Sequence, residues 1–107
     1  MKRFGQIIKV RPEKEAYYRE LHADVWPSVL DMIRECNITN YSIFLRDGYL
    51  FAYFEYVGDD YEADMKKMSE DPETQRWWAE CIPCQEAIET HGPGEWWVNM
   101  EEVFYTE

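Results

Sequence analysis

The chain has 107 residues, and its 22 acidic side chains outnumber its 11 basic ones, which gives a formal net charge of −11 at pH 7. This charge argues against nucleic acids and anionic membranes as partners, because phosphate groups are bound by clustered lysine and arginine. The length fits one domain, residues 1–107, with a single small core. No stretch approaches the roughly 20 apolar residues that a membrane-spanning helix needs.

The first predicted element is a short apolar strand, Phe4 to Val10, which ends at Arg11-Pro12. The residues before it lead directly into the strand pattern, so we expect no signal peptide. The chain has three cysteines, an odd number with no disulfide framework. Together these features predict a reducing, cytoplasmic location.

A helical pattern follows from Glu13 towards Cys36. Tyr18, His22 and Trp26 are spaced four residues apart, so a helix places them on one stripe. Pro27 lacks the N–H that would bond back along the helix, so we expect either a kink or two short helices that meet there. The stripe also carries apolar residues that must face the core, namely Leu21, Val25, Val29, Met32 and Ile33.

His22 has two interpretations at this inward position. It is either a core histidine bonded to a backbone group, or a proton carrier shielded from water. It is one of only two histidines in the chain. The choice between the two depends on the other residues gathered around it.

The middle of the chain predicts a hairpin. Ile38 to Arg46 alternates between two faces, Asp47-Gly48 is a strong turn signal, and Tyr49 to Val57 forms the return strand. The return strand is apolar or aromatic on both faces, which indicates cover on both sides. The chain has too few helices to cover both faces, so we expect a homodimer.

The last third predicts two helices and a strand. Tyr61 to Ser69 and Thr74 to Ala79 read as helices, and Trp96 to Tyr105 reads as a final strand. With the earlier elements, this gives the order β-α-β-β-α-β. The predicted fold class is therefore α+β, with the ferredoxin-like arrangement.

Two further motifs could carry chemistry. Adjacent Trp77 and Trp78 point about 100° apart on a helix, so either one packs in the core while the other lines a cavity, or both are partly buried anchors. The stretch from Cys81 to Cys84 has the shape of a redox or metal half-site. It follows a helix rather than a strand and has no second pair, so we expect no metal or redox role.

Four groups of residues follow one another along the chain, namely Tyr18-x-x-x-His22-x-x-x-Trp26-Pro27, Asn40-Tyr41, Gln75-Arg76-Trp77-Trp78 and Glu102-Val103-Phe104-Tyr105. In this order they resemble the L-rhamnose mutarotase family over almost the whole chain. The resemblance implies a dimeric α+β barrel of ferredoxin-like protomers. It also implies a cofactor-free isomerase that interconverts the α and β anomers of L-rhamnose. His22 would be the catalytic proton donor, and Tyr18, Tyr41, Trp77 and Trp78 would bind the sugar.

The chemistry of mutarotation agrees with this composition. One group takes a proton from the anomeric hydroxyl while another gives a proton to the ring oxygen, and histidine can serve near neutral pH. A neutral sugar tolerates a protein of charge −11, and no metal or electron carrier is required. The second proton-transfer group stays open between a tyrosine, a carboxylate such as Glu102 and a bound water.

The resemblance is weaker between the tryptophan pair and the C-terminus. There the chain departs from the best-known members at Cys81-Ile82-Pro83-Cys84, at His91 and at Gly94-Glu95-Trp96-Trp97, which leaves the preferred aldose open. Two other functions remain. One is a small monooxygenase of the same dimeric barrel class, cofactor-free or linked to haem or flavin. The other is a non-catalytic sugar-binding module.

Overall fold

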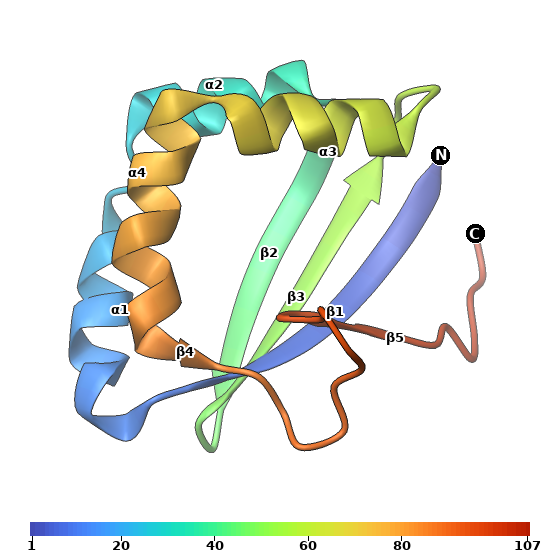
Figure 1. Ribbon diagram of the computed structural model, residues 1–107. Coiled ribbons are helices and arrows are strands. Elements are labelled where there is room, and N and C mark those ends of the chain that lie inside the picture. The colour runs from blue at the N-terminus through green and yellow to red at the C-terminus, as the bar shows by residue number, and fades with distance from the viewer.

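An antiparallel sheet with four α-helices on one of its faces makes up the protein in the computed structural model, which describes residues 1–107 (Figure 1). Two short 3-10 turns, η1 and η2, flank the helices at the start and end of the helical layer. The elements in chain order are β1 (Lys2–Val10), η1 (Pro12–Lys14), α1 (Glu15–Ala23), α2 (Pro27–Glu35), β2 (Ile38–Arg46), β3 (Tyr49–Tyr56), α3 (Tyr61–Glu70), α4 (Pro72–Cys81), η2 (Ile82–Cys84), β4 (Gln85–Glu86) and β5 (Val98–Met100).

The sheet has the strand order β2-β3-β1-β4, and β5 also pairs with β1. Every pair is antiparallel, and β1 and β3 run side by side over their full length. This order, with helices between β1 and β2 and between β3 and β4, is the ferredoxin-like arrangement. The predicted α+β fold is therefore confirmed. Each of the two connections that the ferredoxin-like arrangement makes through a helix contains two consecutive helices here.

Pro27 separates α1 from α2. α1 ends at Ala23, and Pro27 is the first residue of α2, where a missing N–H costs no intrahelical bond. Of the two outcomes expected at this proline, the structure has two short helices. Trp26 therefore lies just before α2 rather than on a continuous helical stripe. Its ring still packs inward, with its centroid 5.2 Å from that of Trp77.

The predicted hairpin is present. Asp47 and Gly48 have φ angles of 53° and 79°, as a tight hairpin turn with two left-handed residues requires, and Arg46 pairs with Tyr49 across it. At the other end of β2 the register shifts between Thr39 and Ser42. A bulge of this kind re-aims the side chains around it.

The two faces of β3 differ in cover. Leu50, Ala52, Phe54 and Tyr56 are buried beneath the helices, whereas the alternate residues are partly exposed on the other face. The sequence predicted that both faces of this strand are covered, but within a single chain the helices cover only one of them. The uncovered face of the sheet carries apolar and aromatic side chains, namely Ile7, Phe44, Tyr49, Phe51, Tyr53, Val98 and Met100.

The last predicted strand is wrong in its extent. The sequence predicts Trp96 to Tyr105, but β5 covers only Val98–Met100, where it pairs with β1. Beyond Met100 the backbone has no ladder partner, and alternation in a sequence supplies no such partner by itself. Phe104 is 79% exposed there, and the Arg3 guanidinium ties the segment down from 3.4 Å above the Tyr105 ring.

None of the helices combines the length and the hydropathy needed to cross a membrane.

Candidate active site

A cavity of about 950 Å³ lies between the helices and the helix-covered face of the sheet. Its walls are mostly apolar and aromatic, and no aspartate or glutamate lines it, although the chain has 22 of these residues. Small-molecule sites commonly combine an apolar wall with a few polar groups. All five residues predicted to form a site line this cavity: Tyr18, His22, Tyr41, Trp77 and Trp78.

His22 lies in the last turn of α1 and uses one ring nitrogen to fix its orientation. Its Nδ1 lies 2.8 Å from the backbone carbonyl oxygen of Tyr18. A carbonyl only accepts, so Nδ1 carries the hydrogen of this bond. Nε2 has no partner in the protein, and the structure has no buried, unpaired side-chain nitrogen or oxygen, so Nε2 is open to solvent. The ring therefore presents a free nitrogen.

Burial lowers the pKa of His22 below the ordinary histidine value of 6.5, and the bond to the Tyr18 carbonyl opposes that effect only in part. The side chain is therefore neutral at pH 7, with its hydrogen on Nδ1 and a lone pair on Nε2. A neutral imidazole with a free Nε2 can accept a proton from a bound hydroxyl group. Of the two interpretations of His22, the structure shows the backbone partner of a core histidine, and it also places the ring in the wall of the cavity.

Aromatic rings hold the imidazole in place. The Tyr18 ring stacks on it with centroids 4.0 Å apart, and Trp77 meets it edge-on at 5.2 Å. Tyr18 is 4% exposed, and burial raises the pKa of its hydroxyl. Tyr41 also lines the cavity, where desolvation raises the pKa of its hydroxyl to about 12 although its side chain is 42% exposed. Both phenols are therefore neutral near pH 7 and act as hydrogen-bond donors or acceptors.

The residues that line the cavity leave fewer candidates for the second proton-transfer group. Glu102, one of the expected options, pairs with Arg3 at 2.9 Å and does not line the cavity of its own chain. The bond to Arg3 lowers the pKa of this carboxyl. A tyrosine hydroxyl or a bound water remains for the second transfer.

The two adjacent tryptophans take different positions. Trp77 is 7% exposed and belongs to the core cluster, while Trp78 is partly buried and packs against that cluster from the cavity side. Of the two expected arrangements, the structure has one core anchor and one wall residue, and both touch the cavity. Trp77 holds the site together because its ring also contacts Trp26 edge-on.

The cysteine motif has an inert environment. Cys81 and Cys84 are buried and not joined to each other, and burial raises the pKa of Cys81 to about 12. A thiol held protonated in this way is a poor nucleophile and a poor metal ligand. No three His, Cys, Asp or Glu side chains gather as metal ligands.

Sequence reasoning missed part of the cavity wall. Gln85, Trp96 and Trp97 also line it. Trp96 and Trp97 begin the predicted final strand, on which adjacent side chains would face opposite sides, but both residues precede β5 and both reach the cavity. Gln85 belongs to β4, which has two residues and no periodic pattern that could predict it.

Two solved structures share this fold. An L-rhamnose mutarotase from Formosa agariphila superposes with a TM-score of 0.76 at 21% identity, covering 100% of both chains. The tetracenomycin F2 cyclase of Streptomyces glaucescens, a type-II polyketide cyclase, superposes with a TM-score of 0.69 at 13% identity, covering 100% of this chain and 97% of the other. At these identities the likeness concerns the fold alone.

The sequence comparisons are more specific. The L-rhamnose mutarotase of Bacillus subtilis (strain 168) is 32% identical over 109 residues, and that of Lactiplantibacillus plantarum is 31% identical over 109 residues, each covering 100% of both chains. A family model described as L-rhamnose mutarotase matches residues 3–106. The chain therefore belongs to the L-rhamnose mutarotase family.

Proposed function

We propose that this chain is an isomerase that interconverts the α and β anomers of L-rhamnose, or of a related aldose, and that His22 is its catalytic residue. Family membership supports the reaction class. The observation that carries the assignment of His22 is its neutral ring, with Nδ1 bonded to a carbonyl and Nε2 open in a cavity without carboxylates.

In the proposed reaction, Nε2 of His22 accepts the proton of the anomeric hydroxyl while the bond between C1 and the ring oxygen breaks. The ring oxygen takes up a proton from a tyrosine hydroxyl or a bound water. The open-chain aldehyde then rotates about the C1–C2 bond. Ring closure reverses the transfers: the histidine returns its proton to the new anomeric oxygen. No electrons are exchanged, so this sequence requires no redox cofactor, and His22 with a tyrosine or a water supplies both proton transfers.

We assign sugar binding to Tyr18, Tyr41, Trp77 and Trp78. The two neutral phenols offer hydrogen bonds to sugar hydroxyls, and aromatic faces suit the C–H faces of a pyranose ring. A neutral ligand also fits a chain of charge −11. We further propose a single domain, residues 1–107, that acts in the cytoplasm, where three buried free thiols stay reduced, without nucleic-acid or membrane partners.

We also propose that the chain forms a homodimer through the uncovered face of its sheet. Phe44 is 64% exposed and Met100 is 41% exposed on that face, and partly exposed aromatic residues of β3 lie between them. Exposed apolar side chains gathered on one face mark an interaction surface. A second copy stacked face to face would bury it and complete a barrel.

The first prediction concerns His22. His22→Ala should slow anomer exchange of L-rhamnose by about 10²–10⁴-fold, since that is the usual contribution of a general acid or base. Exchange rates come from saturation-transfer NMR, and circular dichroism checks the fold. His91→Ala is the matched control, because His91 is exposed, bonds only to the Ile88 carbonyl and lies outside the cavity.

A folded His22→Ala variant that exchanges anomers at the wild-type rate would contradict the assignment of His22. If the wild type itself exchanges no aldose faster than buffer does, the isomerase proposal is wrong. In that case, binding of the sugar without exchange would identify a sugar-binding module.

The second prediction concerns pH. Because burial lowers the pKa of His22, its base form persists to lower pH than that of a free histidine. The protein-catalysed rate should rise with pH through a midpoint below 6.5 and level off at higher pH, as the imidazole becomes fully neutral. The rate is measured across pH after subtraction of buffer catalysis. A midpoint above 6.5 would contradict the proposed state of the ring.

The third prediction separates the two tryptophans. Trp77→Ala should lower the free energy of unfolding by about 3–5 kcal/mol, because it empties a buried site in the core. Trp78→Ala should leave a protein that is more stable than the Trp77→Ala variant but that binds the sugar more weakly than the wild type does. Urea denaturation and calorimetric titration with L-rhamnose measure the two effects. Equal losses of stability would show that the two rings do not have these separate roles.

The fourth prediction concerns assembly. Light scattering at micromolar concentration should give twice the 13.0 kDa mass of one chain. Phe44→Glu should give a single-chain mass, because it places a charge in the apolar surface that the interface would bury. Ala79→Glu, on the exposed side of α4, is the control and should remain a dimer. A wild type that behaves as a monomer would rule the interface out.

A further inference from the structure

Gln85 and Trp96 form a hydrogen-bonded chain that ends at Tyr18. The Trp96 indole nitrogen lies 2.8 Å from Oε1 of Gln85, and Nε2 of Gln85 lies 3.3 Å from the Tyr18 hydroxyl. An indole N–H only donates, so the amide oxygen must face Trp96 and the amide NH₂ must face Tyr18. The orientation of this amide is therefore set by chemistry.

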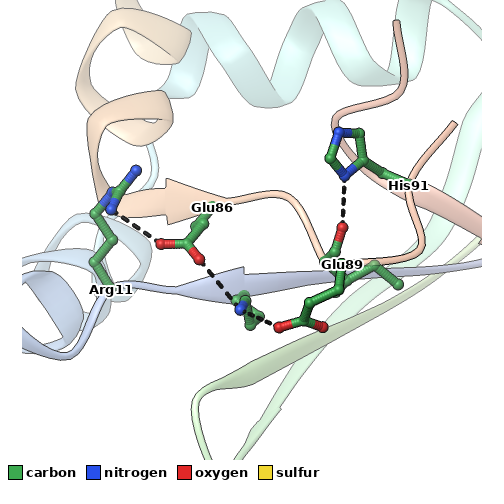
Figure 2. Close-up of polar contacts among 6 residues, drawn as sticks. Arg11, Glu86, Glu89 and His91 are labelled. Atoms are coloured by element: carbon green, nitrogen blue, oxygen red, sulfur yellow. Dashed lines mark hydrogen bonds and ion pairs between the residues drawn. The ribbon is translucent and has the colours of Figure 1, made fainter. Parts of the chain in front are cut away.

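The amide has little freedom to turn. Gln85 is 4% exposed, and its backbone pairs with Val10 at the end of β1. Its neighbour Glu86 accepts from Arg11 at 3.0 Å and from Lys9 at 3.1 Å (Figure 2). Lys9 Nζ also lies 2.7 Å from Glu89. The segment after Gln85 is therefore held to β1 by two carboxylates, those of Glu86 and Glu89.

The direction of the bond decides what the Tyr18 hydroxyl can do. A hydroxyl that accepts from an amide keeps its own hydrogen free. No protein acceptor is paired with that hydrogen, and Tyr18 lines the cavity. A bound molecule would therefore meet a donor at this point, and the neighbouring His22 would present an acceptor at Nε2.

We infer that Gln85, oriented by Trp96, is a positioning residue that keeps the Tyr18 hydroxyl a hydrogen-bond donor to an oxygen atom of the bound sugar. This inference rests on the proposed function, since it needs an aldose in the cavity. It gives a role to residues in the part of the chain that departs from the best-known family members. Burial, which keeps the Tyr18 phenol neutral, is consistent with a donor that binds without giving up its proton.

The test is a double-mutant cycle on Gln85→Met and Tyr18→Phe. Each single variant should weaken binding of L-rhamnose by about 2–10-fold, which corresponds to one lost hydrogen bond. The KM for anomer exchange should rise more than kcat falls. In the Tyr18→Phe background, Gln85→Met should weaken binding no further, because the hydroxyl on which it acts is absent.

A second variant and a control accompany the cycle. Gln85→Glu keeps the size and the acceptor for Trp96, but its carboxylate would take the Tyr18 hydrogen, so binding should weaken again. If Gln85 were only a structural filler, this substitution would leave the Kd unchanged. Gln75→Met is the control, because Gln75 bonds to the Ser69 carbonyl at 2.9 Å outside the cavity.

Calorimetric titration gives the Kd independently of catalysis, so the inference and the proposed function fail in different ways. A Gln85→Met effect that is equal in both backgrounds, or an unchanged Kd in Gln85→Glu, would overturn the role of Gln85. Binding without exchange in the wild type would overturn the isomerase proposal and leave the cycle measurable. A wild type that neither binds nor exchanges any aldose would overturn both.

Discussion

The arrangement of the site depends on how β1 is paired on its two edges. One edge runs against β3 from Lys2 to Lys9, which sets the register of the hairpin and of the sheet. The other edge is shared by two short strands, β5 opposite Gly5–Ile7 and β4 opposite Lys9–Val10. The chain between β4 and β5 therefore leaves the edge of β1 and returns to it a few residues away. On this path Trp96 and Trp97 reach the cavity wall. If β4 or β5 were longer, more of this segment would pair with β1 and less of it could reach the cavity.

The chemistry of the site follows from what surrounds it. A histidine beside a carboxylate has a raised pKa and remains charged at neutral pH, whereas one surrounded by aromatic rings loses solvation and becomes neutral. This cavity has the second kind of wall, in a chain where acidic residues outnumber basic ones two to one. The acidic residues are confined to the helix termini and the outer surface. This distribution leaves Nε2 of His22 as a base in a cavity that no carboxylate lines.

The parts of the fold that could be predicted have strong local signals. The hairpin followed from Asp47-Gly48, and the break between α1 and α2 followed from Pro27, because both residues restrict the backbone wherever they occur. The stripe of Tyr18 and His22 was visible because helical periodicity is local. The outer limits of β5 were not predictable in the same way. β1 continues to Lys2 beyond the residue that pairs with Met100, yet β5 ends there. Where this strand ends therefore depends on pairing between distant segments and not on the alternation of its own residues.

The residues of the site also differ in whether a local sequence pattern could predict them. Tyr18 and His22 stood at a helical spacing that places them together, whereas the resemblance to the family joined Trp77 and Trp78 to the same site. Gln85 could not be found in this way, because its importance comes from two partners, Trp96 and Tyr18, that are distant from it in the chain. A buried glutamine has no periodic signature, and only its hydrogen bonds distinguish a positioning group from a filler. The residues that offer proton chemistry were thus readable from the sequence, whereas the one that sets the direction of a hydrogen bond depended on the folded sheet.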